Sequence, residues 1–178
     1  MTFPKDATQG PATEPSQYPG SLDATGAIET ARFDEGLEIG YRFWDAHGQA
    51  PLFPFGYGLS YTRFAFGPLS VRRTPDGGAL VKTTIRNTGE REGSQVLQAY
   101  LGFPKDAVEP PKQLKGFQKV RLKPGETREV EIRLAPEAFR CWDPAAHRWA
   151  VAGGAYQVMV GTSSRDILAA AGLSVAAR

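Results

Sequence analysis

The chain is poor in residues that build disulfides and metal sites. Its 178 residues include one cysteine, Cys141, and two histidines, His47 and His147. A single thiol cannot form an internal disulfide, so we expect Cys141 to be a buried structural thiol. Each histidine lies next to an alanine, and neither has a histidine or cysteine partner at metal-ligand spacing. The sequence therefore predicts no disulfide framework, no metal site and no bound cofactor.

Long apolar runs are also missing. Met1–Gly10 has no apolar core of the signal-peptide type, and the longest apolar stretch, Ile167–Ala177, is too short to span a bilayer. We therefore expect a soluble chain without a membrane partner and without an export signal of its own. A longer parent protein would keep its signal elsewhere, so the compartment stays open between cytoplasm, periplasm and exterior.

The sequence lacks a nucleophile motif of the hydrolase type. The candidate nucleophiles are Ser60, Ser163, Ser164 and Cys141. None lies in a glycine-flanked elbow or has a neighbouring base. Residues 163–166 are better interpreted as a turn that hydroxyl and carboxylate side chains cap.

An acidic group near the amino end is the other candidate for chemistry, and it comprises Asp34, Glu35, Glu38 and Asp45. Leu37–Trp44 has the pattern of a short strand, with alternate apolar residues on one side. In such an extended segment Glu35 and Glu38 would point to opposite faces and could not form an acid/base pair. A structural role, such as a salt bridge to Arg42, is the simpler interpretation.

Charge changes sign along the chain. Up to Thr62 there are 3 basic and 8 acidic residues, and the remainder has 18 basic and 11 acidic residues. The second part contains a basic run made of Lys112, Lys115, Lys119, Arg121 and Lys123. Such asymmetry can mark a nucleic-acid module, but no recognition motif or stacking-aromatic pattern accompanies it. We interpret the run as the solvated face of a strand pair and expect no nucleic-acid partner.

From Arg63 onward apolar residues recur with a period of two, which is typical of half-buried strands. In Arg128–Leu134, for example, Val130, Ile132 and Leu134 face one way. Turn sequences such as Pro75–Gly78 separate the runs. The candidate strands are residues 64–73, 79–87, 94–103, 114–122, 127–134, 148–151, 155–161 and 166–175, with one helical turn expected at 135–139. Their number and spacing predict a mostly β protein with two packed antiparallel sheets, a fibronectin type III-like or immunoglobulin-like sandwich.

Alternation is expected in residues 97–103 as well. Leu97, Ala99 and Leu101 form one side of this run, and Gln98 and Tyr100 lie on the other.

Before residue 31, by contrast, prolines at positions 4, 11, 15 and 19 and the absence of periodic apolar residues predict an irregular segment. Such a segment cannot form a core alone.

Aromatic residues, prolines and glycines crowd into Pro51–Phe66, which reads PLFPFGYGLSYTRFAF. Further short runs follow the same order along the chain: Thr2-Phe3-Pro4, Tyr18-Pro19-Gly20, EGLEIGYRFWD at 35–45, Asn87-Thr88-Gly89, LKGFQKV at 114–120, Lys123–Glu126 and VGTSSRD at 160–166. Together they cover nearly the whole chain. In this combination the chain resembles the C-terminal region of glycoside hydrolase family 3 enzymes, the β-glucosidases and their relatives, with its fibronectin type III-like domain.

The resemblance implies a domain organisation. Residues 1–50 would be the largely irregular tail of the α/β sandwich domain that precedes the fibronectin-like module in these enzymes. Residues 51–62 would be an aromatic linker, and residues 63–178 the β-sandwich. The family's nucleophilic aspartate and acid/base glutamate belong to regions upstream of this segment. The resemblance thus implies that this chain has no catalytic residue and is inactive alone, although its parent hydrolyses O-glycosyl bonds.

Two functions remain open at this stage. In the first, the chain is a structural module that docks on the catalytic domains of a family 3 hydrolase, and the candidate docking residues are Phe53, Phe55, Tyr57 and Tyr61. In the second, it is a free-standing carbohydrate-binding or adhesion module, and the candidate sugar-stacking residues are Trp44, Trp142 and Trp149. Packing in the core or between domains is the simpler role for these aromatics, and exposed linker aromatics would also favour self-association.

A third arrangement, in which a separately encoded catalytic part binds this chain in trans, is compatible with the same residues. The parent's sugar and linkage specificity belong to a pocket that this sequence does not contain. The oligomeric state is also left open.

Overall fold

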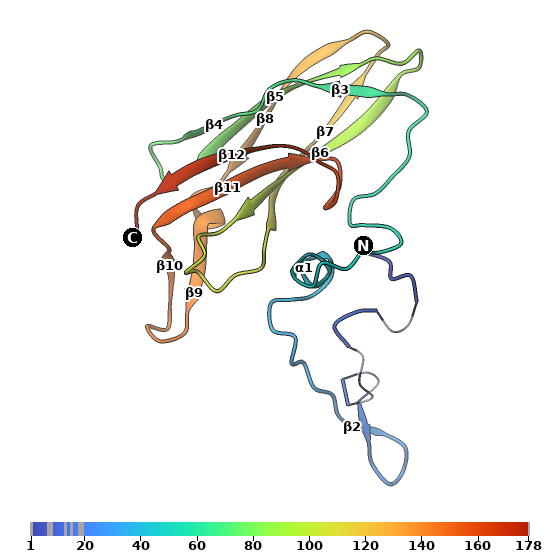
Figure 1. The fold of residues 1–178 in the computed structure, drawn as a ribbon, viewed down its shortest axis with the longest axis vertical. Coiled ribbons are helices and arrows are strands. Elements are labelled where there is room, and N and C mark those ends of the chain that lie inside the picture. Colours follow the sequence, from blue (N-terminus) through green and yellow to red (C-terminus); the bar gives the residue numbers. More distant parts are fainter. Residues whose placement is uncertain (1, 7–8, 13, 15, 18–19, 178) are drawn as a thin grey trace. The chain divides into compact units, whose positions relative to one another are not determined.

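A computed structural model of the chain describes residues 2–6, 9–12, 14, 16–17 and 20–177. Pro15, Tyr18 and Pro19 lie outside these residues. They contribute to the predicted irregular segment and to the family resemblance. The chain divides into two compact units, Met1–Phe55 and Gly56–Arg178. The elements are mostly β-strands that pair antiparallel, as the sequence predicts (Figure 1).

The first unit contains a small hairpin that the sequence does not predict. Strand β1 (Ser21–Leu22) pairs with β2 (Ile28–Thr30). The Asp23 carboxylate closes the turn by accepting hydrogen bonds from the backbone N–H groups of Thr25 at 2.8 Å and Ala27 at 3.0 Å. An Asx-type turn of this kind forms a hairpin without apolar periodicity, so the segment expected to be largely irregular contains one short regular element.

The strand predicted at Leu37–Trp44 is also wrong. Helix α1 spans Tyr41–Ala46, and turns precede it. An extended segment needs a neighbouring strand for its backbone groups, whereas a helix satisfies them locally; the His47 N–H donates to the Phe43 carbonyl at 3.0 Å. The expected salt bridge to Arg42 is replaced by a contact of 2.9 Å between Glu38 and His47.

The second unit is a β-sandwich. One sheet is built around β5 (Ala79–Asn87), which pairs with β8 (Thr127–Leu134) on one edge. On its other edge β5 pairs in succession with β3 (Phe64–Phe66) and β4 (Ser70–Arg73). The predicted single strand at 64–73 is therefore two strands. Gly67-Pro68 separates them, because proline has no N–H to donate to the ladder.

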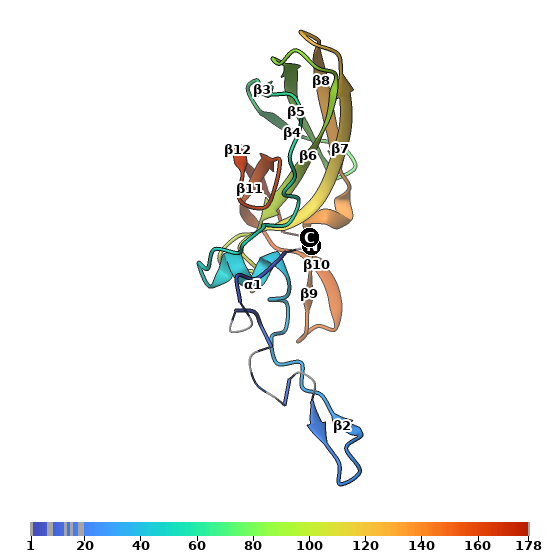
Figure 2. The ribbon, with the colours of Figure 1, turned by 90° about the vertical axis from the view of Figure 1, so that its right-hand side faces the viewer.

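The other sheet has the order β12-β11-β6-β7. Its members are β6 (Gly93–Gly102), β7 (Gln113–Leu122), β11 (Gly154–Gly161) and β12 (Ile167–Val175). Figure 2 shows the two sheets edge-on, with β7 and β8 continuing into each other at one end of the sandwich. This arrangement is the predicted fibronectin type III-like sandwich.

The core lies between the sheets. In β8 the alternation is as predicted, because Val130, Ile132 and Leu134 are buried while the intervening residues are exposed. In β6, however, both sides are buried: Gln98 and Tyr100 are as inaccessible as Leu97, Ala99 and Leu101. The sequence pattern of such a strand is that of a half-buried strand, because the outer side carries polar side chains even though other segments cover it.

A short 3-10 helix, η1 (Pro136–Phe139), leads into a hairpin of β9 (Arg140–Asp143) and β10 (Arg148–Val151). The helical turn is predicted and β10 matches the strand expected at 148–151, whereas β9 is not predicted. Figure 1 shows this hairpin extending beyond the end of the two sheets. None of the helices formed by the described residues is long and apolar enough to cross a membrane.

Candidate docking surface

Two of the four predicted docking aromatics belong to the first unit. Phe53 meets Phe3 edge to face, with 6.4 Å between ring centroids, and their backbones form an isolated bridge. Phe55 lies against Tyr41 of α1 at 5.2 Å. These rings therefore already pack inside the unit, and Phe53 keeps 42% of its surface exposed.

The other two aromatics belong to the second unit. Tyr57 is 51% exposed and Tyr61 is 91% exposed, and Leu59 between them is 90% exposed. These three alternate side chains are here called the linker face. The structure thus divides the predicted set between two units, and the linker face is its exposed part on the sandwich unit.

The segment that carries the linker face is held at both ends. At its start Gly56 lies so close to Gln98 of β6 that a Cβ atom there would be 2.1 Å from the amide nitrogen of that side chain. At its end the Thr62 hydroxyl donates to the Asn87 side-chain oxygen at 2.6 Å. The face is therefore presented from a fixed stretch of backbone.

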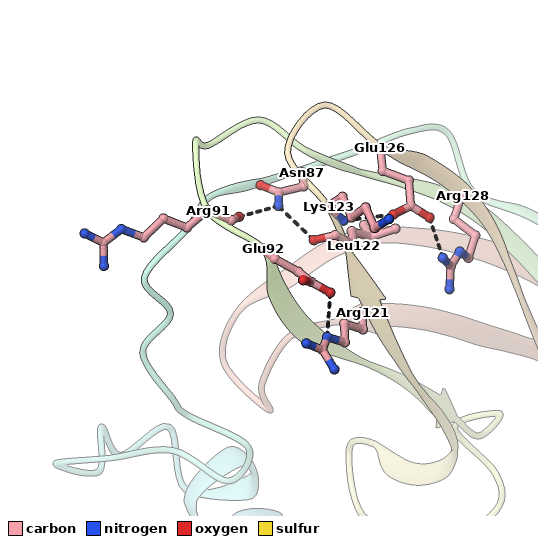
Figure 3. Close-up of polar contacts among 8 residues, drawn as sticks. All are labelled: Asn87, Arg91, Glu92, Arg121, Leu122, Lys123, Glu126 and Arg128. Carbon is pink, nitrogen blue, oxygen red and sulfur yellow. Dashed lines mark hydrogen bonds and ion pairs between the residues drawn. The ribbon is translucent and has the colours of Figure 1, made fainter.

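Asn87 is the centre of a buried polar junction (Figure 3). Its side-chain NH₂ group donates to the Arg91 carbonyl at 2.7 Å and to the Leu122 carbonyl at 3.0 Å. Its Oδ1 atom accepts from Thr62 and from the Gly89 N–H at 3.1 Å. The side chain is fully buried, and every one of these bonds offsets the cost of removing an amide from water. Asn87 thereby joins the linker to the ends of β5 and β7.

Ion pairs surround the junction. Glu92 contacts Arg121 at 2.6 Å, and Glu126 pairs with Arg128 while accepting from the Lys123 backbone N–H at 2.8 Å (Figure 3). The backbone bond from Lys123, followed by the Arg128 pair, lowers the pKa of Glu126 below its usual value. Part of the predicted basic run thus lies at this turn, where Glu92 pairs with Arg121.

A hollow of about 390 Å³ lies beside the linker face. Its walls come from residues 56–60, from the start of β6 and from the turn at 162–166. The turn is built as predicted, because the Ser163 hydroxyl accepts from the N–H of Arg165 at 3.3 Å and of Asp166 at 3.0 Å. Two motifs about 100 residues apart in the sequence, the linker and the VGTSSRD run, therefore form one surface.

The three tryptophans occupy two kinds of position. Trp44 of α1 is only 3% exposed, which leaves no ring face for a sugar. Trp142 and Trp149 lie opposite each other on the β9–β10 hairpin, with ring centroids 5.6 Å apart, and they are 47% and 62% exposed. This exposure does not fit packing in the core of this chain, and packing between domains or against a sugar stays open for the pair.

The reactive side chains of the described residues are dispersed. No group of three or more histidine, cysteine, aspartate or glutamate side chains in the described part of the chain is placed to hold a metal ion. Cys141 is half-buried, more accessible than expected, and its thiol lies 3.7 Å from the Ala150 carbonyl. Sequence reasoning missed the roles of Asn87 and Gln98; the Asn87-Thr88-Gly89 turn was a signal for the first, but nothing local identified the second.

Comparison with known proteins locates this region in a larger family. The fibronectin type III-like domain model matches residues 95–164. The β-glucosidase cel3A of Pyricularia oryzae is 44% identical over 147 residues, which are 76% of this chain and 19% of that protein. The thermostable β-glucosidase B of Acetivibrio thermocellus is 38% identical over 157 residues, 86% of this chain and 21% of that protein.

Solved structures agree. The β-glucosidase DesR of Streptomyces venezuelae, in complex with D-glucose, superposes with a TM-score of 0.90 at 37% identity, over 98% of this chain and 22% of that one. The family 3 β-glucosidase of Bifidobacterium adolescentis gives a TM-score of 0.90 at 36% identity, over 99% of this chain and 25% of that one. This chain spans about a fifth of the length of its curated relatives. By sequence and structure it corresponds to the C-terminal region of glycoside hydrolase family 3 β-glucosidases, with its fibronectin type III-like domain.

Proposed function

We propose that the chain is a non-catalytic structural module of a β-glucosidase-type family 3 hydrolase, and that it stabilises the catalytic domains by docking on them through the linker face. The observation that carries the proposal is the exposure of Tyr57, Leu59 and Tyr61 on a backbone segment that Gln98 and Asn87 hold in place. Large apolar side chains kept in water on a fixed segment are typical of a surface that a partner covers.

Magnitudes favour apolar docking over charge attraction. Fully burying a large apolar side chain contributes ~1.5–3 kcal/mol, whereas an exposed ion pair contributes ~0–1 kcal/mol. Covering the linker face alone would thus outweigh several surface pairs between the acidic first part and the basic sandwich. The same residues would drive self-association of the chain when the catalytic domains are absent.

The first test is the mass of the native polypeptide. An antibody raised against this chain should detect a band several times larger than 19.3 kDa in the source cells. A band near 19.3 kDa would contradict a covalent module and leave docking in trans to a separate catalytic chain as the form to examine.

The second test is substitution of the linker face. Leu59→Ser and Tyr61→Ser should leave the melting temperature of this chain alone unchanged, because both side chains are about nine-tenths exposed. In the longer protein each should lower the melting temperature by several degrees, since ~1–3 kcal/mol of docking is lost. Val108→Ser is the matched control, because Val108 is a 95% exposed apolar residue outside the linker. Equal melting of all three variants in the longer protein would refute the docking role.

The carbohydrate-binding alternative now depends on Trp142 and Trp149, because Trp44 is buried. Their exposure on the hairpin is the observation in its favour. Tryptophan fluorescence that stays flat during titration with cello- and xylo-oligosaccharides would remove this alternative for neutral sugars.

A further inference from the structure

A second hollow, of about 230 Å³, lies at the base of the β9–β10 hairpin. The residues that give it chemical character are Arg73 of β4, Arg140 of β9, Trp149 of β10 and Asp76 of the turn before β5. All of them belong to the sandwich unit. The hollow is smaller than the ~300–1,000 Å³ pockets that hold drug-sized ligands, so its size suits a single sugar ring or a similarly small group.

The hairpin extends this hollow into a longer surface. Trp142 pairs with Trp149 and Arg140 pairs with Val151 in the antiparallel register. Directly opposite residues share a face, and so do residues two apart on one strand. Arg140, Trp142, Trp149 and Val151 therefore form one face, and Arg148 belongs to the opposite one. The face formed by Arg140, Trp142, Trp149 and Val151 thus carries two half-exposed indole rings next to a guanidinium group.

The charges at the hollow are unbalanced. Asp76 is its carboxylate, and this group is already engaged by Arg133, by the Thr74 hydroxyl and by the Gly78 N–H at 3.2 Å. Arg73 lies over the Phe139 ring, 4.8 Å from its centroid. The Nη1 atom of Arg73 is buried and makes no hydrogen bond among the described residues. A buried cationic nitrogen without an acceptor is costly, and an anionic ligand in this hollow would supply the missing negative charge.

We propose that this hollow and the indole pair form a binding site for a carboxylate-bearing saccharide, a uronic acid unit of an acidic glycan. The exposed guanidinium group of Arg140 binds the carboxylate with paired hydrogen bonds that match its geometry, and the charge of Arg73 attracts it through space. The apolar face of the sugar ring lies against Trp149 and Trp142, as in pockets where aromatic walls orient a ligand that few polar groups specify. The site is independent of the linker face and of the proposed docking role.

The test is a titration of this chain followed by the indole N–H signals in ¹H–¹⁵N NMR spectra, with the three tryptophans assigned by single Trp→Phe variants. Trigalacturonate should shift the signals of Trp142 and Trp149 and leave that of the buried Trp44 unchanged. Cellotriose, which lacks the carboxylates, should bind at least tenfold more weakly. Arg140→Gln should weaken trigalacturonate binding about tenfold, as expected for the loss of a charge-assisted contact. Arg148→Gln, on the opposite face of the same hairpin, should change it less than twofold.

Triglutamate distinguishes the sugar from a carboxylate of polypeptide origin. Binding of triglutamate as tight as that of trigalacturonate would overturn the saccharide assignment, because it would show that the site selects acidic side chains. A dissociation constant of ~1 mM is typical of weak binding. Absence of shifts at trigalacturonate concentrations up to ten times that value would overturn the site itself. Trp149→Ala provides a second test of stacking. Loss of the Trp142 shift in that variant supports stacking of the sugar on the indole pair. An unchanged affinity for trigalacturonate contradicts it.

Discussion

At the scale of single residues, Tyr156 shows how a buried polar group fixes the sandwich. Its ring is 1% exposed and packs against Phe103 and Phe139. Its hydroxyl contacts the Phe139 carbonyl at 3.1 Å and the Ala152 carbonyl at 2.9 Å. The bond to Ala152, four residues upstream, has the pattern of the tyrosine corner of immunoglobulin-like sandwiches. Burial raises the pKa of this hydroxyl to about 12.

The raised pKa of Tyr156 predicts a pH dependence of stability. A tyrosine in the unfolded chain loses its proton near pH 10, and folded Tyr156 keeps it up to about pH 12. Between these values the unfolded state binds fewer protons, so the free energy of unfolding falls as pH rises. The contribution is complete below pH 10, and about 2 kcal/mol is lost by pH 12.

Urea unfolding between pH 8 and 11 checks this prediction. Tyr156→Phe should be less stable at neutral pH by ~1–3 kcal/mol, because the Phe139 and Ala152 carbonyls lose the hydroxyl that they share. Its stability should then decline less steeply above pH 10 than that of the unsubstituted chain. Tyr61→Phe, at a position 91% exposed, is the control and should follow the unsubstituted chain. Equal slopes for both variants would contradict the assignment.

At the scale of elements, the linker behaves as part of the sandwich. Gly56 has a φ of 85°, which glycine adopts readily, and its α-carbon lies against the Gln98 side chain. That amide also donates to the Thr162 carbonyl at 3.0 Å and accepts from the Tyr100 hydroxyl. A side chain at position 56 would displace Gln98 from both partners.

Gly56→Ala should therefore destabilise the sandwich by ~1–3 kcal/mol, measured by urea unfolding. Gly58→Ala is matched to it, two residues away in the same segment. A Cβ atom at Gly58 would meet nothing within 4 Å, so we expect a change within ~0.5 kcal/mol. Similar losses in both variants would show that the close approach of Gly56 to Gln98 does not contribute to stability.

How far each element follows from the sequence depends on whether its partners are nearby in the chain. The β8 pattern is decisive because one side faces the core and the other faces water. In β6, Gln98 and Tyr100 are buried through contacts with distant segments, which local periodicity cannot show. The alternation of apolar residues from Leu37 to Phe43 predicts a strand, but no neighbouring strand pairs with it, and Tyr41–Ala46 form helix α1. Of the site, the sequence indicated the linker aromatics, but not which of them are already packed.

At the scale of the whole molecule, the boundary between the two units is open to a direct test. Residue 63 is the expected start of the sandwich, whereas the compact units separate at residue 56. The bonds of Thr62 to Asn87 and the packing of Gly56 on Gln98 support the earlier boundary. We therefore propose that residues 56–62 belong to the sandwich in folding, while also serving as the linker.

Two shortened polypeptides distinguish these boundaries. Residues 56–178 should melt cooperatively, and residues 63–178 should melt ~5–10 °C lower, since the loss of the Thr62 bond and of the cover on Gln98 corresponds to ~1–2 kcal/mol. Thr62→Val in the longer polypeptide isolates the share of the hydroxyl. Identical melting of both polypeptides would place the boundary at residue 63.

The linker face has a further consequence for the lifetime of the chain. Tyr57, Leu59 and Tyr61 lie outside any strand and are open to solvent, and exposed irregular segments are the preferred sites of proteolytic nicking. Aromatic and leucine side chains are also the cleavage positions of chymotrypsin-like proteases. A chain whose linker face is uncovered thus carries its own cleavage site, while one that is docked hides it. Proteases would then degrade unassembled copies selectively. The same three side chains would stabilise the assembled protein and expose the unassembled chain to cleavage.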